Sequence, residues 1–214
     1  MNLERIRRGL LKFRSIKLNV EKNGVYYIMR ELFDNEAYFF NMEGIKFMTY
    51  AKEIEDKVMN VNFTQYFEDK CDYEFALNKD NYKPYINDNL TYRVLDNSDK
   101  VIVDRMKKEC TKSDLDHGQV SIEDPVVMGA FIGGKLVGIA SFWEWEEDLN
   151  DIGVLVHPNY RGIGVGISTV SRLIDEAPKS KICIYRADYD NPGSVRIAEK
   201  LGFEVVTEIY RYKG

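Results

Sequence analysis

The sequence is short of the residues that mark several classes of protein. It has three cysteines, Cys71, Cys110 and Cys183, which are far apart, odd in number and form no Cys-x-x-Cys pair. This pattern argues against a disulfide framework and is typical of a chain kept in a reducing compartment. We therefore expect a cytoplasmic location, and we expect no metal site.

Long apolar runs and an excess of basic charge are missing too. No uninterrupted apolar segment approaches the roughly 18 residues of a membrane span, so stable membrane insertion is not expected. Lys and Arg number 30 against 35 Asp and Glu, a net charge of −5. General nucleic-acid binders usually carry a basic excess, so we expect no nucleic-acid partner.

The sequence has ample material for a folded core. Hydrophobic residues make up 44% and aromatic residues 13% of the 214 residues, which argues against disorder. At roughly 150 residues per domain, this length fits one large domain or two small ones.

The first part of the sequence is the harder one to interpret. Residues 1–18 are basic and amphipathic, which predicts a docked surface helix, with a membrane-surface helix as the alternative. Residues 25–32 fit either a strand or a helix, and residues 51–59 favour a helix. The turn-forming Asn87-Asp88-Asn89 marks a boundary. We therefore expect residues 1–89 to form an α/β extension packed on a domain of residues 90–214.

The pattern is clearer from residue 90 onward. Gly133-Gly134 predicts a two-residue hairpin turn, Asn191-Pro192 opens a helix, and Gly202 closes it. The order β-α-β-β-β-α-β-α-β predicts an α/β (α+β) domain with a mixed sheet. The expected strands are at 90–95, 126–132, 136–145, 151–156, 181–187 and 204–212, and the expected helices are at 99–110, 164–177 and 192–202.

A glycine-rich turn carries the main functional signal. The strand that ends at Val156 is followed by Arg161, Gly162, Gly164 and Gly166, where a helix begins. Glycines let backbone amides approach a ligand, and the N-terminus of a helix attracts anions. The turn therefore predicts a phosphate or pyrophosphate site, to which Arg161 adds a charge.

Two common nucleotide-binding motifs fit this turn poorly. A Walker loop needs a lysine, and the turn has none. In the dinucleotide fingerprint Gly-x-Gly-x-x-Gly, Gly162 and Gly164 fit but the third position is Ile167. Asp188, near the end of the next strand, partly favours the fingerprint, whereas the preceding antiparallel hairpin argues against it.

The spacing Arg-x-x-Gly-x-Gly at Arg161, Gly164 and Gly166 resembles the acetyl-coenzyme A loop of the GNAT superfamily of N-acetyltransferases. The preceding Val-His-Pro-Asn-Tyr is similar to the family's strand-to-loop sequence. The segment from Asn191 to Gly-Phe203 looks like its second signature. The resemblance covers residues 90–214. It implies a mixed, mostly antiparallel central sheet flanked by helices, with an N-terminal extension.

The resemblance also implies a set of cofactor-binding residues, with acetyl-coenzyme A as co-substrate. The backbone of Val154, Leu155 and Val156 would pair with the pantetheine arm, and Asn191 would bind near the thiol. The pyrophosphate would lie beside Arg161, on the residues Gly162, Ile163, Gly164, Val165, Gly166 and Ile167.

The catalytic residues are less clear. An amine that attacks a thioester must lose a proton, so a base or a water relay is needed. Glu144, Glu146 and Asp151 are candidates, with Asp151 preferred because it lies on the cofactor strand; each is alternatively a solvated carboxylate. Many family members protonate the thiolate with a tyrosine seven residues after the asparagine, where this sequence has Ala198. Tyr189 or water would then serve.

Other candidates have structural explanations. His117 lies in a polar loop, Ser-Asp-Leu-Asp-His-Gly, that could border the acceptor site, although a surface position explains it equally. His157 fits a structural role, and Cys183 fits core packing. Trp143 and Trp145 either line an acceptor pocket or pack against the N-terminal segment.

The sequence thus predicts an N-acetyltransferase that acts on an amine of a small molecule or peptide in a ternary complex. The main alternative is a catalytically weak sensor or scaffold that binds acyl-coenzyme A, motivated by Ala198. A nucleic-acid or membrane module led by residues 1–18 is a third reading. A homodimer is compatible with the sequence, which does not identify the acceptor.

Overall fold

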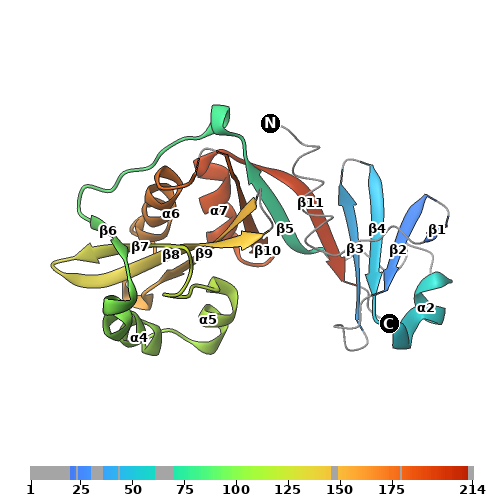
Figure 1. Ribbon diagram of the computed structural model, residues 1–214, viewed down its shortest axis with the longest axis horizontal. Helices are drawn as coiled ribbons and strands as arrows, with labels where there is room; N and C mark the ends of the chain where they lie inside the picture. Colours follow the sequence, from blue (N-terminus) through green and yellow to red (C-terminus); the bar gives the residue numbers. More distant parts are fainter. Residues whose placement is uncertain are drawn as a thin grey trace.

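A single twisted sheet organises the protein. The computed structural model describes residues 20–22, 24–29, 36–42, 44–60, 70–145, 149–178 and 180–211. Within these ranges the strands form one 11-stranded sheet with the order β1-β2-β4-β3-β11-β5-β10-β9-β8-β7-β6 (Figure 1). This mixed, mostly antiparallel sheet flanked by helices confirms the expected fold class.

Short helices interrupt the series of strands along the chain. The strands are β1 (Val20–Lys22), β2 (Val25–Met29), β3 (Ala37–Met42), β4 (Ile45–Tyr50), β5 (Lys70–Leu77), β6 (Thr91–Leu95), β7 (Val126–Ile132), β8 (Lys135–Trp145), β9 (Leu149–Val156), β10 (Ile182–Asp188) and β11 (Phe203–Arg211). The α-helices are α2 (Glu55–Met59), α4 (Lys100–Lys108), α5 (Lys112–Gly118), α6 (Val165–Asp175) and α7 (Pro192–Leu201). Within the described ranges no helix is long and apolar enough to cross a membrane.

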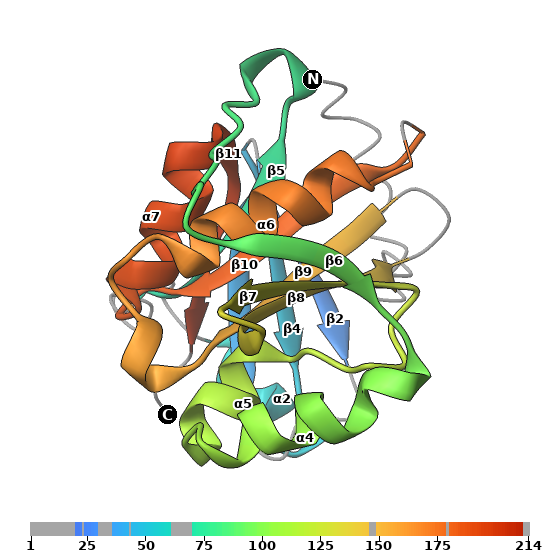
Figure 2. The ribbon, with the colours of Figure 1, turned by 90° about the vertical axis from the view of Figure 1, so that its left-hand side faces the viewer.

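Helices cover both faces of the C-terminal part of the sheet. Figures 1 and 2 show α6 and α7 on one face and α4 and α5 on the other. Under α6 and α7 the core contains the fully buried Phe75, Phe142 and Leu173. Under α4 a second core contains Val103 and Ile139. Burying apolar faces on both sides fixes the helices on the sheet.

The N-terminal strands extend the same sheet. β3 pairs with β11 through registers such as Phe40 with Ile209, and β4 and β2 continue outward from it. β5 lies between β10 and β11 and is antiparallel to both. The described strands before residue 90 and those after it therefore belong to one continuous sheet, and the separation of residues 1–89 and 90–214 into two domains stays a prediction.

Most expected elements after residue 90 are present, with one correction. The strand expected at 126–132 is β7, and residues 25–32, which fitted strand or helix, contain β2. The polar loop expected around His117 is wrong, because residues 112–118 form α5. A capping box explains the helix: Thr111 accepts from the Asp114 N–H, and Asp114 accepts from the Thr111 N–H at 2.8 Å. The helix expected at 1–18 lies outside the described residues.

Two glycines allow α5 to lie directly on β9. A Cβ atom on Gly153 would lie 2.5 Å from the Gly118 carbonyl oxygen and 2.9 Å from that of Gln119. A Cβ atom on Gly118 would lie 3.0 Å from the Val154 carbonyl oxygen. Because these neighbours are backbone atoms, they can move away only if α5 moves. The position of α5 therefore depends on having glycine, which has no side chain, at both positions.

Replacing Gly153 with alanine should destabilise the fold. We expect Gly153→Ala to lower the free energy of unfolding by about 1–3 kcal/mol, because the methyl group overpacks the contact between α5 and β9. Urea unfolding measures the change. Gly193→Ala is the matched control, since its nearest neighbour would be an ordinary 3.5 Å away. Equal stability of the two variants would contradict the packing argument.

Candidate functional site

The site begins where two parallel strands separate. β9 and β10 pair from Leu149–Ile182 to Ile152–Tyr185 and no further. Both strands continue: β8 holds β9 as far as Val156, and β5 holds β10 as far as Asp188. The edge of β9 that faces β10 is therefore unpaired after Ile152. A free strand edge offers backbone donors and acceptors to an extended ligand.

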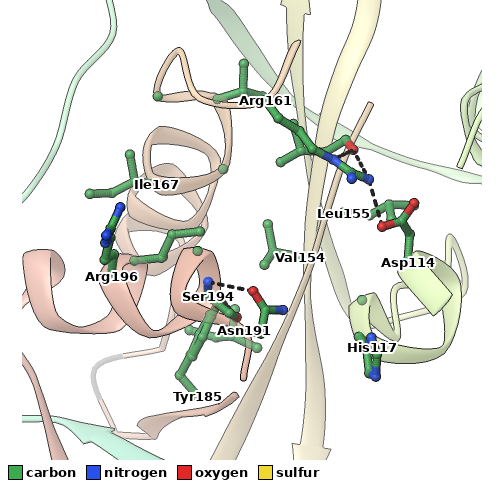
Figure 3. A pocket seen from close by; sticks show the side chains of 18 of the residues that line it. Asp114, His117, Val154, Leu155, Arg161, Ile167, Tyr185, Asn191, Ser194 and Arg196 are labelled. Atoms are coloured by element: carbon green, nitrogen blue, oxygen red, sulfur yellow. Dashed lines mark hydrogen bonds and ion pairs between the residues drawn. The ribbon is translucent and has the colours of Figure 1, made fainter. Parts of the chain in front are cut away.

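A cavity of about 460 Å³ lies at this separation. Its walls come from β9, the turn before α6, the first turns of α6 and α7, and α5 (Figure 3). Ile152 and Tyr185 line it where the strands part, and Gly162 and Gly164 line it at the glycine-rich turn. The cavity thus joins the unpaired strand edge to the N-terminus of a helix.

The glycine-rich turn has the backbone conformation that only glycine adopts easily. Gly162 and Gly164 have φ angles of +78° and +85°, and Gly164 is the N-cap of α6 without any capping side chain. The first N–H groups of α6 are therefore left to a ligand. A Cβ atom on Gly166 would lie 3.0 Å from Ile197 and 3.2 Å from Val156, so this glycine lets α6 pack closely on α7 and β9.

Arg161 lies across the rim of the cavity. Its Nη2 atom is 2.8 Å from Oδ1 of Asp114 on α5, and it also approaches the Val156 carbonyl oxygen at 3.5 Å (Figure 3). Partial burial acts to raise the pKa of Asp114, but hydrogen bonds from Arg161 and Thr111 outweigh it and lower the pKa. Half of the Arg161 side chain is exposed, so it can also bind an anion.

Asn191 opens α7 at the wall of the cavity. Its Oδ1 atom accepts the backbone N–H of Ser194 at 3.1 Å, the usual N-cap bond. The Ser194 hydroxyl in turn lies 2.7 Å from the hydroxyl of Tyr185 on β10. Figure 3 shows the three side chains together beside Val154. An amide and two hydroxyls thus meet near the separation of the strands.

Charged residues lie around the α5 side of the cavity. His117 is 2.9 Å from Asp188, and Arg186 is 2.7 Å from Asp151; His117 and Arg186 both line the cavity. Burial raises the pKa of Asp151 to about 6, although Arg186 opposes the shift. Burial and a hydrogen bond with Asp188 raise the pKa of Asp72 to about 6. These two carboxyl groups, which lie behind the lining residues, can therefore hold or release protons near neutral pH.

The structure brings most of the expected cofactor-binding residues together. Ile163 is the exception: it is 55% exposed outside the cavity, and its carbonyl accepts a hydrogen bond from Asn87 at 3.0 Å. The expected residues that line the cavity are Val154, Leu155, Val156, Arg161, Gly162, Gly164, Val165, Gly166, Ile167 and Asn191.

The expected catalytic residues are more scattered. Asp151 is 4% exposed and does not line the cavity itself, but its partner Arg186 does. Glu144 lies on β8 beside the paired part of β9 and forms an ion pair with Lys181. Tyr189 is 55% exposed, its ring is tilted against that of Tyr73, and it does not line the cavity. Of the three, only Asp151 adjoins the cavity, and their roles stay predictions.

Sequence reasoning missed several lining residues. Asp114 was missed because α5 was not predicted, and Tyr185 because its strand appeared only as a core element. A helical period counted from Asn191 would have indicated Ser194 and Ile197 on the same face of α7. Arg196 and Lys200 of α7 also line the cavity, one helical turn apart.

Comparison with known proteins places the chain in a family. Residues 63–203, well over half of the chain, match the acetyltransferase (GNAT) family, and the chain belongs to that family. An L-methionine sulfoximine/L-methionine sulfone acetyltransferase of Salmonella typhimurium is 32% identical over 83 residues, and the L-amino acid N-acyltransferase MnaT of Escherichia coli is 31% identical over 83 residues. Each match covers 36% of this chain and 48% of the relative, so the chain spans about half of their length.

A solved structure extends the likeness of the fold. A GNAT-family acetyltransferase of Colwellia psychrerythraea superposes with a TM-score of 0.57 at 13% identity, over 82% of this chain and 65% of that one. At this identity the likeness concerns the fold alone. The superposed part, 82% of this chain, is larger than the region from residue 90 onward.

The ion pair between Asp151 and Arg186 generates a testable prediction. Arg186→Met should lower the free energy of unfolding by about 2 kcal/mol at pH 8, because it leaves a buried carboxylate without its cation. The loss should shrink at pH 5, because Asp151, whose pKa of about 6 rises further without Arg186, is then protonated. Urea unfolding at both pH values measures the difference.

The double variant Asp151→Asn/Arg186→Met is the control for this prediction. It should recover most of the stability at pH 8, since the buried carboxylate of Asp151 is removed together with its cation. The same loss at pH 5 and pH 8, or no recovery in the double variant, would show that Arg186 stabilises the fold by packing rather than by charge.

Proposed function

We propose that the protein is an acetyl-coenzyme A-dependent N-acetyltransferase that moves the acetyl group from the thioester to an amine in a ternary complex. The observation that carries the proposal is the unpaired edge of β9 after Ile152, inside a cavity that ends at the N-terminus of α6. An extended amide-containing arm fits a strand edge, and a pyrophosphate fits a helix N-terminus. Both fit one ligand with a pantetheine arm.

The binding groups are mostly backbone atoms. The pantetheine amides would pair with residues 154–156, and the pyrophosphate would lie on the N–H groups of residues 162–167. The side of Gly162 where a Cβ would project is open for at least 4 Å, which leaves room for phosphate oxygens. Arg161 would add charge at the rim, and Asn191 would contact the arm near the thiol end.

The chemistry needs a base and a donor for the oxyanion. Acetyl-coenzyme A supplies an activated acetyl group, and the attacking amine must be unprotonated. Asp151, through a water that Arg186 would orient, is our candidate for the base, because its pKa of about 6 leaves it ionised at neutral pH. A backbone N–H at Leu155 or Val156 would stabilise the oxyanion.

The acceptor would enter from the side of α5. His117 and Arg186 line that end of the cavity, and Asp72 of β5 pairs in register with Asp188, the ion-pair partner of His117. We therefore include residues 1–89 in the acceptor side of the proposal. The two relatives are named for amino-acid substrates, so L-amino acids are the first acceptors to test, followed by other small amines and peptides. A cytoplasmic location and a homodimer remain part of this proposal.

Charge reversal at the rim of the cavity should weaken the binding of acetyl-coenzyme A. We expect Arg161→Glu to raise the Kd of acetyl-coenzyme A at least about tenfold, because one cation near the phosphates becomes an anion. Calorimetry measures the Kd, and release of free thiol in the presence of an amine panel measures turnover.

Lys100→Glu is the matched control for charge reversal. Lys100 also forms an ion pair, 3.9 Å from Asp104, but it lies on α4 outside the cavity lining. Its variant should bind acetyl-coenzyme A like the wild type. An unchanged Kd for Arg161→Glu would remove the phosphate site from the proposal.

The base should be visible in the pH dependence of turnover. If Asp151 must be ionised, kcat/KM rises as the pH increases through about 6. Asp151→Asn should lower kcat/KM about a hundredfold and abolish this rising limb of the pH profile. Arg186→Gln should move the limb to higher pH, because Arg186 holds the pKa of Asp151 down against burial and the charge of Glu74.

Asp72→Asn is the control for the pH profile, because burial also raises the pKa of Asp72 to about 6. We expect this variant to keep the limb. If the limb disappears in Asp72→Asn and remains in Asp151→Asn, the base assignment is wrong.

A second candidate function is a sensor or scaffold that binds acyl-coenzyme A without turnover. The observation in its favour is Ala198, a buried methyl group where many relatives would carry a tyrosine hydroxyl. Tight binding of acetyl-coenzyme A without thiol release on a broad amine panel would favour this function over the enzyme.

A further inference from the structure

A thioester that reacts in this cavity must release a thiolate, and few side chains can assist it. Among the described lining residues only Tyr160, Tyr185 and Ser194 carry hydroxyl groups. Tyr160 lies in the turn before α6, where its ring contacts His157 and the Lys135 ammonium group. Tyr185 and Ser194 remain for the part of the cavity where the strands separate.

The position of the hydroxyl pair follows from the strand register. Tyr185 pairs with Ile152 at the last step before β9 and β10 part. Ser194 lies in the first turn of α7, where the hydrogen bond that its backbone N–H donates to Oδ1 of Asn191 fixes the backbone. A ligand with its phosphates at α6 and its arm along residues 154–156 extends toward this point. Its sulfur would therefore lie near the pair.

The hydrogen-bond directions of the pair can be assigned. Tyr185 is 1% exposed, and among the described residues Ser194 is the one hydrogen-bond partner of its hydroxyl, at 2.7 Å. Either hydroxyl can be the donor at this distance; because a buried O–H group without an acceptor is unfavourable, we infer that Tyr185 donates to Oγ of Ser194. Burial raises the pKa of Tyr185 to about 12, so the phenol keeps its proton. The Ser194 hydrogen is then free to point into the cavity.

We propose that Ser194, held by Tyr185, donates a hydrogen bond to the thioester sulfur and stabilises the thiolate as it leaves. This inference rests on the proposed function. Ser194 touches the reacting atoms and is the catalytic residue, whereas Tyr185 is a positioning residue that acts through it. The exposed Tyr189 and the methyl group of Ala198 offer no hydroxyl at this point.

The step balances without another reagent. The amine nitrogen forms a bond to the acetyl carbon, the carbon–sulfur bond breaks, and its electron pair goes to sulfur. The proton of the amine goes to the base and then to water. Ser194 and Tyr185 keep their protons, and the thiolate takes its proton from water as the products leave.

The direct test is the acidity of the thiol of bound coenzyme A, followed by the ultraviolet absorbance of the thiolate. A hydrogen bond to sulfur favours the thiolate and lowers the pKa of the thiol. Ser194→Ala should therefore raise this pKa by about one unit. Tyr185→Phe should raise it less, and the double variant should match Ser194→Ala, because Tyr185 acts through Ser194.

Turnover provides a second readout. Ser194→Ala should lower kcat about ten- to a hundredfold, the range expected for one hydrogen bond to a charged group, with little change in the Kd of acetyl-coenzyme A. Ser141→Ala is the matched control. Ser141 is buried and its hydroxyl donates to Asp124 at 2.5 Å, but it lies on β8 away from the cavity lining. An unchanged Kd also verifies that each variant is folded.

The outcomes separate this inference from the proposed function. If the enzyme turns over but the thiol pKa is unchanged in Ser194→Ala, the proposed function stands and the role of Ser194 is overturned. A loss of kcat in Tyr189→Phe but not in Ser194→Ala leads to the same conclusion. A shifted thiol pKa without turnover on any amine supports Ser194 and refutes the enzyme. Failure to bind coenzyme A refutes both.

Discussion

The separation of β9 from β10 after Ile152 and Tyr185 is the constraint on which the site depends. Each strand keeps its outer neighbour, β8 or β5, so the separation exposes only the inner edges. Gly153 brings α5 onto one face of β9, and Gly166 brings α6 and α7 against the end of the other. The strands are thus held apart by what packs on them, and the cavity exists without any loss of the outer ladders.

The two ends of the cavity differ in their electrostatics. Arg161, Arg196 and Lys200 line the end formed by α6 and α7, together with the N-terminus of a helix. Carboxylates gather behind the α5 end, where Asp151 and Asp188 are held by Arg186 and His117. A chain with a net charge of −5 thus concentrates positive potential where an anionic ligand fits. Asp151, whose pKa burial raises to about 6, lies behind the opposite end.

Sequence reasoning found what is local and missed what is not. The glycine-rich turn could be predicted because three glycines, Arg161 and the start of α6 are neighbours in the chain. The pairs Arg161–Asp114 and Tyr185–Ser194 could not, because they join separate elements. Strand alternation gives the face on which Glu144 lies, but not its distance from the point where β9 and β10 part. The N-terminal strands were ambiguous because their short apolar runs fit strand and helix equally.

The recognition by backbone groups that we propose would tolerate divergence of the sequence. A strand edge and a helix N-terminus present the same N–H groups whatever the side chains, and a GNAT-family acetyltransferase with 13% identity shares the fold with a TM-score of 0.57. What must be kept is the position of each interaction rather than the residue that makes it. A donor to the leaving sulfur can therefore come from α7 at position 198 or at Ser194, provided that it reaches the same point. Position 194 needs the fixed partner that Tyr185 supplies, since a serine hydroxyl rotates freely unless another group holds it.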